Sequence, residues 1–158
     1  MKKNYTKGFT LLEILLVVAA IAILAGIVIF ALNPGKQLGD TRNAQRSVDT
    51  NTLLNALYQY AIDNNGSFPA GIDSTPGSSQ VFGTAGSGAD STCTATTTVA
   101  STVDVSSALI PTYLVGIPFD PSTGSAANTD YYVNIGSNGR LTVGACDPEQ
   151  SATIEVTR

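Results

Sequence analysis

Residues 9–32 read FTLLEILLVVAAIAILAGIVIFAL, an apolar stretch of 24 residues whose only ionisable side chain belongs to Glu13. A helix of this length extends about 36 Å at its usual rise, which is enough to cross the hydrocarbon core of a bilayer. Apolar side chains surround the whole helix, so it has no face suited to water. The stretch therefore predicts a transmembrane helix that carries one carboxylate.

The residues on either side of this helix differ in charge. Residues 1–8, MKKNYTKG, carry three lysines, which by the positive-inside rule keep this end on the cytoplasmic side. The remaining chain, about 125 residues, is then exported and has room for one modest domain. From Phe9 onward the chain has 5 Lys and Arg against 12 Asp and Glu, a net charge of −7.

This composition argues against two classes of function. A strongly acidic domain lacks the basic surface that sequence-independent nucleic-acid binding requires, and no direct nucleic-acid site is evident. The chain has no histidine, the commonest general base and metal ligand. We therefore expect a protein that is not an enzyme.

Simple explanations of residues 1–32 leave features unexplained. A secretory signal peptide would be cut near Ala20-Ile21-Ala22, but the apolar run continues for ten more residues and Glu13 interrupts its core. A lipoprotein signal needs a cysteine, which this segment lacks. A plain membrane anchor accounts for the length but not for Glu13, because an ionisable residue in a membrane helix is costly and usually functional.

The sequence KGFTLLE at residues 7–13, followed by the apolar run, closely resembles the class III signal of type IV pilins and type II secretion pseudopilins. The resemblance implies that a prepilin peptidase cuts after Gly8 and that the new terminus, Phe9, is N-methylated. It also implies that the helix stays in the mature protein and that Glu13 takes part in filament assembly.

Elementary electrostatics agrees with this role for Glu13. Cleavage after Gly8 leaves a free α-amino group, which is mostly cationic at neutral pH. In a filament of packed helices, Glu13 can meet the amino group of a neighbouring subunit, and each charge then compensates the other in an apolar interior. A carboxylate in the first turns also suits the positive end of the helix dipole. The pair would select the register between subunits more than it adds stability.

A second helix is predicted after the break at Asn33-Pro34-Gly35. Residues 36–64 have amphipathic spacing, and Asn64-Asn65-Gly66 with Pro69 forms a stop. The residues expected on its apolar side are Ala44, Val48, Leu54, Leu57, Tyr58, Ala61 and Ile62. Those expected on the solvated remainder are Lys36, Arg42, Arg46, Asp49 and Asp63.

The rest of the chain predicts a loop followed by a sheet. Residues 67–108 are rich in Gly, Ser and Thr and indicate a long surface loop, with Val81 and Phe82 as its main apolar pair. Beyond it we expect three strands, at Tyr131–Ile135, Arg140–Ala145 and Ala152–Thr157, the first two joined by a turn at residues 136–139.

The predicted fold class is α+β and type IV pilin-like, with a long N-terminal helix packed on a small antiparallel β-sheet. The helix has a transmembrane half and an amphipathic half. The expected segments are the leader at 1–8, the transmembrane and filament-core helix at 9–32, the amphipathic half at 33–66, the surface loop at 67–108 and the sheet region at 109–158.

Cys93 and Cys146 lie far apart and outside any C-x-x-C motif. In an exported chain an even pair of cysteines favours one disulfide, with two buried free thiols as the alternative. The bridge would close a loop of about 54 residues and contribute on the order of 4 kcal/mol by the chain-entropy estimate.

Calcium is the one metal that the sequence brings into consideration. The acidic residues expected in loops around the sheet are Asp120, Asp130, Asp147 and Glu149. Hard oxygen ligands suit calcium, and the resemblance adds that major pseudopilins bind this ion in their C-terminal loops. The spacing matches no self-contained loop motif, however, so we expect no cofactor and keep calcium as a minor alternative.

The sequence thus predicts a structural subunit of a type IV pilus or related filament, serving adhesion, motility or DNA uptake. Its partners would be copies of itself, a prepilin peptidase/N-methyltransferase, an assembly platform protein and an ATPase. It would cross the inner (cytoplasmic) membrane once before assembly and form a periplasmic or extracellular filament afterwards. The alternatives are a major pseudopilin of a type II secretion system, favoured by PFDP at residues 118–121 and NGSFP at 65–69, and a monomeric membrane-anchored extracytoplasmic binding module.

Overall fold

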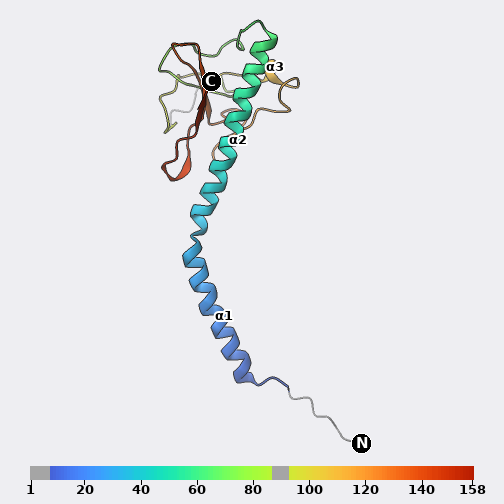
Figure 1. Cartoon of the computed structure of the whole chain (residues 1–158), viewed down its shortest axis with the longest axis vertical. Helices are drawn as coiled ribbons and strands as arrows, with labels where there is room; N and C mark the ends of the chain where they lie inside the picture. The colour runs from blue at the N-terminus through green and yellow to red at the C-terminus, as the bar shows by residue number, and fades with distance from the viewer. Residues whose placement is uncertain (1–7, 87–92) are drawn as a thin grey trace, which may run out of the picture. The chain divides into compact units, whose positions relative to one another are not determined.

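The computed structural model describes residues 8–86 and 93–158. The chain divides into two compact units, Met1–Leu38 and Gly39–Arg158. The elements follow the order α1 (Leu11–Leu32), α2 (Pro34–Asp63), β1 (Gln80–Val81), α3 (Ser106–Leu109), β2 (Tyr131–Ile135), β3 (Leu141–Ala145), the 3-10 turn η1 (Glu149–Ser151) and β4 (Glu155–Thr157) (Figure 1). A long apolar helix, a second helix and a small antiparallel sheet confirm the predicted α+β, pilin-like architecture.

A single residue separates the two long helices. Asn33 ends α1 in the left-handed conformation, with φ of 42°. Its carbonyl oxygen accepts hydrogen bonds from the backbone N–H groups of Lys36 and Gln37 at the start of α2. Pro34 is the first residue of α2, a position where the missing N–H costs nothing. The predicted break is confirmed, and it lies at Asn33 rather than within Pro34-Gly35.

The sheet has four antiparallel strands in the order β1-β2-β3-β4. β2 has the predicted bounds, and its register with β3 runs from the pair Tyr131 and Ala145 to the pair Ile135 and Leu141. The tight turn between them contains Gly139, whose φ of 75° favours glycine. β4 is shorter than expected, because only Glu155–Thr157 pair with β3.

The main core lies between α2 and one face of the sheet (Figure 1). From α2 it receives Leu53, Leu54, Ala56 and Leu57. From β2 and β3 it receives Tyr131, Val133, Leu141, Val143 and Ala145.

The predicted orientation of α2 is wrong at several positions along the helix, where Ala44 is also exposed. Val48 is 60% exposed and Ile62 is 72% exposed, whereas Arg46 and Asp49 are buried. The leucines at 53 and 57 fix which side of the helix faces the sheet. Helical periodicity then carries positions 46 and 49 to the same side, where polar groups of the sheet region meet them.

Residues 67–108, expected as a surface loop, contribute to the core. Val81 and Phe82 have no exposed surface, and Val103 and Val105 are at most 4% exposed. The Phe82 N–H donates to the carbonyl oxygen of Tyr131 at 2.9 Å, which aligns this segment with β2. The few apolar residues of this segment are widely spaced among Ser, Thr and Gly, so the composition concealed their burial.

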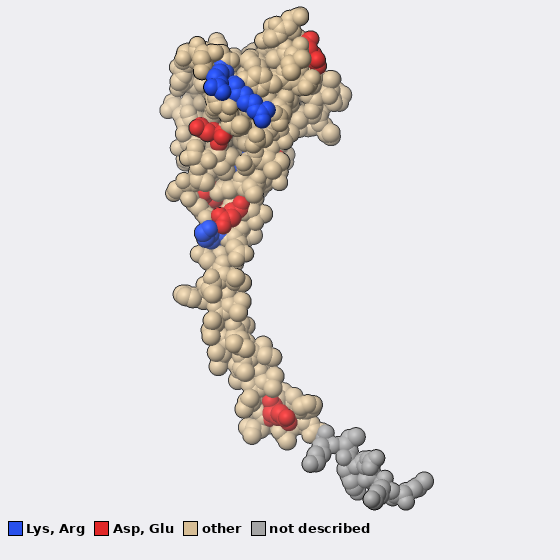
Figure 2. Space-filling view, viewed as in Figure 1, with Lys and Arg blue, Asp and Glu red and all other residues tan. Residues whose placement is uncertain are grey.

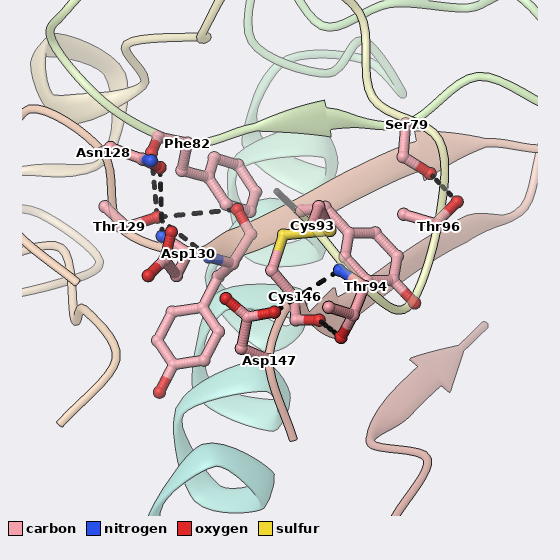
Figure 3. The surroundings of a disulfide bond; sticks show 12 residues. Ser79, Phe82, Cys93, Thr94, Thr96, Asn128, Thr129, Asp130, Cys146 and Asp147 are labelled. Atoms are coloured by element: carbon pink, nitrogen blue, oxygen red, sulfur yellow. Dashed lines mark hydrogen bonds between the residues drawn. A yellow bond between two sulfur atoms is a disulfide. The ribbon is translucent and has the colours of Figure 1, made fainter. Parts of the chain in front are cut away.

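A disulfide joins Cys93 to Cys146, as the sequence predicted, on a second cluster that contains Val81 and Tyr132 (Figure 3). The backbone N–H groups of Thr94 and Ala95 both donate to the carbonyl oxygen of Cys146, at 3.2 and 3.1 Å. The bridge thereby joins the interior of the 67–108 segment to the residue that follows β3.

Gly144 leaves room for the ring of its cross-strand partner, Tyr132. The two residues are paired in the β2–β3 register, and a Cβ atom at position 144 would lie 2.3 Å from Tyr132 Cζ. The hydroxyl of Tyr132 donates to Glu155 Oε2 at 3.3 Å, across the strand on which Gly144 lies. Burial, with the nearby Glu155 carboxylate, raises the pKa of Tyr132 to about 12.

Replacing this glycine tests the packing directly. We expect Gly144→Ala to lower the free energy of unfolding by about 1–3 kcal/mol, because the buried ring of Tyr132 must move to admit a methyl group. Urea unfolding of the full chain in detergent measures the change. Gly116→Ala is the matched control, since its Cβ meets nothing within 4 Å, and should stay within about 0.5 kcal/mol of the parent. Equal stability of both variants would show that the Tyr132 ring does not require the glycine.

Candidate functional site

The first candidate site is the surface of α1. No residue of this helix is buried, and its exposed apolar side chains include Leu11 at 82% and Phe30 at 91%. In Figure 2 the surface of α1 is free of charged side chains except near its N-terminal end, and the sequence has Glu13 as the only charged residue of the helix. Among the described residues, α1 is the one helix long and apolar enough to cross a membrane.

The N-terminal end of α1 places the predicted processing residues together. Gly8 and Phe9 precede the helix in non-helical backbone, and both are exposed. Thr10 caps the helix, because its side-chain oxygen accepts the backbone N–H of Glu13 at 3.2 Å. Thr10 and Glu13 have the spacing of a capping box, so local sequence fixes where the helix starts and sets the carboxylate in its first turn.

This arrangement has a clear chemical consequence. An apolar helix with every side chain exposed is stable only in lipid or against other apolar helices. The bond between Gly8 and Phe9 lies outside the helix, in non-helical backbone. Cleavage there and the assembly role of Glu13 stay predictions.

A second cluster, buried and polar, was missed by sequence reasoning. The guanidinium of Arg46, fully buried on α2, forms a two-point ion pair with Asp120, Nε to Oδ2 at 2.5 Å and Nη2 to Oδ1 at 3.0 Å. Nη2 also donates to Ser122 Oγ at 2.8 Å. Nη1 donates to Asn43 Oδ1 at 2.8 Å and to Glu149 Oε1 at 3.5 Å. One residue thus ties α2 to the turn after Pro118 and to η1.

The environment of Asp120 favours its charged form. Burial opposes ionisation and is the largest single effect. The hydrogen bonds from Arg46, Ser122 and the Thr123 N–H together outweigh it, and they lower the pKa of Asp120 to about 2. Asp49 lies beside this cluster and accepts a hydrogen bond from the Tyr131 hydroxyl at 2.8 Å. Burial raises the pKa of Tyr131 most, and the hydrogen bond to Asp49 raises it further.

Glu149 connects η1 to the outer side of the same cluster. Its carboxylate accepts hydrogen bonds from Arg42 at 2.5 and 2.8 Å, which lower the pKa of Glu149. Its backbone N–H and C=O form a reciprocal pair with the Asn43 side chain, at 3.0 and 2.8 Å. Helical periodicity could have indicated this site, because it places Arg46 and Asp49 on the same side of α2 as the buried leucines.

The four calcium candidates have different partners in the structure. Asp120 and Glu149 meet the arginines of α2. Asp130 and Asp147 lie beside the disulfide, where Thr94 donates its N–H to Asp147 Oδ1 at 3.4 Å (Figure 3). Within residues 8–86 and 93–158, no group of three or more His, Cys, Asp or Glu side chains is arranged to hold a metal ion. Calcium binding stays a prediction.

The depressed pKa of Asp120 predicts how stability depends on pH. An unfolded aspartate binds its proton near pH 4, whereas folded Asp120 does so only near pH 2. Its contribution, about 2 kcal/mol, is therefore fully present above pH 4 and is lost as pH falls toward 2. We expect Asp120→Asn to be less stable at pH 7 and to lose less stability than the parent between pH 4 and 2. Urea unfolding along a pH series measures this, and parallel profiles for the two proteins would contradict the assignment.

Comparison with known proteins bears on the N-terminal site. The family model described as the prokaryotic N-terminal methylation motif matches residues 3–29. The type II secretion system core protein G of Aeromonas hydrophila is 40% identical over 65 residues, which cover 41% of this chain and 44% of that protein. The chain thus spans less than half of the relative it matches, and no solved structure gives a significant match. Residues 3–29 are therefore a methylation motif of the pilin and pseudopilin type, carried by a chain whose α+β architecture is pilin-like.

Proposed function

We propose that this protein is a structural subunit of a type IV pilus or a related filament and is not an enzyme. It is made as a precursor, cut between Gly8 and Phe9, methylated at Phe9 and polymerised through α1. The observation that carries the proposal is the methylation motif at residues 3–29 on a helix whose apolar side chains are all exposed. Such a helix requires an apolar environment, and the motif is typical of subunits that pass from membrane to filament.

In this proposal α1 lies first in the membrane and then in the filament. Before assembly, α1 spans the inner membrane and the exported domain lies outside the cytoplasm. After assembly, α1 packs against α1 helices of neighbouring copies, and the small side chains of Ala19, Ala22 and Gly26 permit close approach. Glu13 then pairs with the amino group of Phe9 on a neighbour. The other partners are the prepilin peptidase/N-methyltransferase, the platform protein and the assembly ATPase.

One observation favours a narrower alternative. The relative from Aeromonas hydrophila is a core protein of a type II secretion system, so a major pseudopilin in a periplasmic filament is the second candidate. The monomeric binding module differs from both, because it predicts an intact leader and no dependence on Glu13.

The first test is the intact mass and N-terminal sequence of the protein purified from its native membrane. We expect a chain that begins at Phe9 and is heavier by one methyl group. A chain that retains residues 1–8 would contradict processing, and one that begins after Ala22 would indicate a cleaved secretory signal instead.

The second test separates assembly from processing. Glu13→Gln removes the charge but keeps the shape of the side chain. We expect cleavage after Gly8 to continue. The yield of sheared filaments should fall by about tenfold or more, because the amino group of the neighbouring Phe9 loses its compensating charge. Glu13→Asp keeps the charge and should restore part of the filament yield. Leu11→Gln places the same amide side chain at a nearby position of α1. It is the control for the effect of adding a polar side chain to the apolar helix. Normal assembly of Glu13→Gln would overturn the proposed pairing.

A further inference from the structure

The structure describes all of α2, and the outward side of this helix carries no charged side chain from Ala44 to Ile62. The two charged residues of this stretch, Arg46 and Asp49, are both buried. Its exposed residues are amides, residues with hydroxyl groups, and the apolar Ala44, Val48 and Ile62. We call these exposed residues of 44–62 the outer face of α2. At the usual helical rise this uncharged face is about 27 Å long.

A groove with a volume of about 400 Å³ runs beside this face. One wall is residues 112–114, and the other is formed by α2 through Thr52, Asn55, Ala56 and Gln59. The first wall is held in place, because the Tyr113 hydroxyl donates to Asp63 Oδ2 at 2.8 Å and the Tyr113 ring packs edge-on against Tyr60. The groove is therefore preformed, and the uncharged face continues into it.

The charge of the remaining surface opposes contact between copies of this domain. Residues 39–158 carry 4 Arg against 11 Asp and Glu, a net charge of −7. Two such surfaces repel each other, and a carboxylate buried without a partner is costly, whereas amides and hydroxyls can satisfy one another. Arg158, at the edge of the outer face, donates to Asn55 Oδ1 at 2.7 Å and adds a positive charge there. The outer face of α2 is thus a surface on which copies can meet without like-charge repulsion.

The connection to α1 brings the second copy within reach. Asn33 alone separates α1 from α2, so copies whose α1 helices pack together also bring the starts of their α2 helices close. We infer that the outer face of α2, with its groove, is a contact surface for a neighbouring copy of this chain. Because one screw operation relates all subunits of a filament, the neighbour meets this face with a different part of its own surface. The inference rests on the proposed function and extends it, since it adds subunit contacts in the domain to those of α1.

A charge placed in the groove tests this contact. Gln59 is exposed, and Gln59→Glu adds one negative charge with little change of shape. We expect processing and the melting temperature in detergent to match the parent. The yield of sheared filaments should fall by about tenfold or more, because the new carboxylate is buried without a partner. Asn138→Asp adds the same charge in the exposed turn between β2 and β3, where its Oδ1 can still accept the Arg140 N–H, and should assemble like the parent.

Covering of the groove by a second copy can be measured directly with Gln59→Cys and a maleimide reagent. Labelling should be slower by about tenfold in intact filaments than in the same protein dissociated in detergent, because thiol reactivity requires access. Asn138→Cys is the matched control and should react at the same rate in both states. This measurement also decides the matter if Gln59→Glu lowers the melting temperature.

Three results would overturn the inference while leaving the proposed function in place. They are parental filament yield for Gln59→Glu, equal labelling of Gln59→Cys in filaments and in dissociated protein, and slow labelling that persists after dissociation. The last would show that something other than a second copy covers the groove. A parent chain that forms no filaments overturns the proposed function, and this inference with it.

Discussion

A helix of 22 residues that buries none of its side chains imposes the main constraint on this protein. Apolar surface of that extent is tolerated only in lipid or in contact with other apolar helices. The single carboxylate at its N-terminal end adds a second requirement, because Glu13 needs a cationic partner wherever water is excluded. In the proposed filament a neighbouring copy would meet both requirements, because its α1 would cover the apolar surface and the amino group of its Phe9 would pair with Glu13. The proposed filament is thus the assembly in which this helix has a stable environment.

The domain formed by residues 39–158 depends on a different set of interactions. Leucines of α2 and aliphatic residues of β2 and β3 form its apolar core, and the Cys93–Cys146 disulfide anchors the 67–108 segment. The buried face of α2 begins with polar residues and not with apolar ones. There Arg46 joins α2 to the turn that contains Asp120 and to η1, which contains Glu149, through charge-assisted hydrogen bonds. Breaking such a buried pair by removing one partner is costly, so the cluster specifies how α2 seats on the domain.

The sequence was informative where a pattern acts locally. The length of α1, the break at Asn33, the strand at Tyr131–Ile135 and the pairing of two cysteines each follow from periodicity, turn chemistry or composition. The same reasoning failed where burial depends on distant partners. Nothing near Arg46 indicates that Asp120, 74 residues later, compensates its charge. Likewise the burial of Val81 and Phe82 depends on β2. The Ser- and Thr-rich sequence around these two residues does not indicate that contact.

The measurement that tests the central claim most directly is electron cryomicroscopy of filaments sheared from cells that express this protein. The account predicts a map in which α1 helices pack around the filament axis, with the first residue Phe9 close to Glu13 of an adjacent subunit. The globular domains should form the outer layer. A map in which α1 lies away from the axis, or in which residues 1–8 remain attached at the core, would contradict the account.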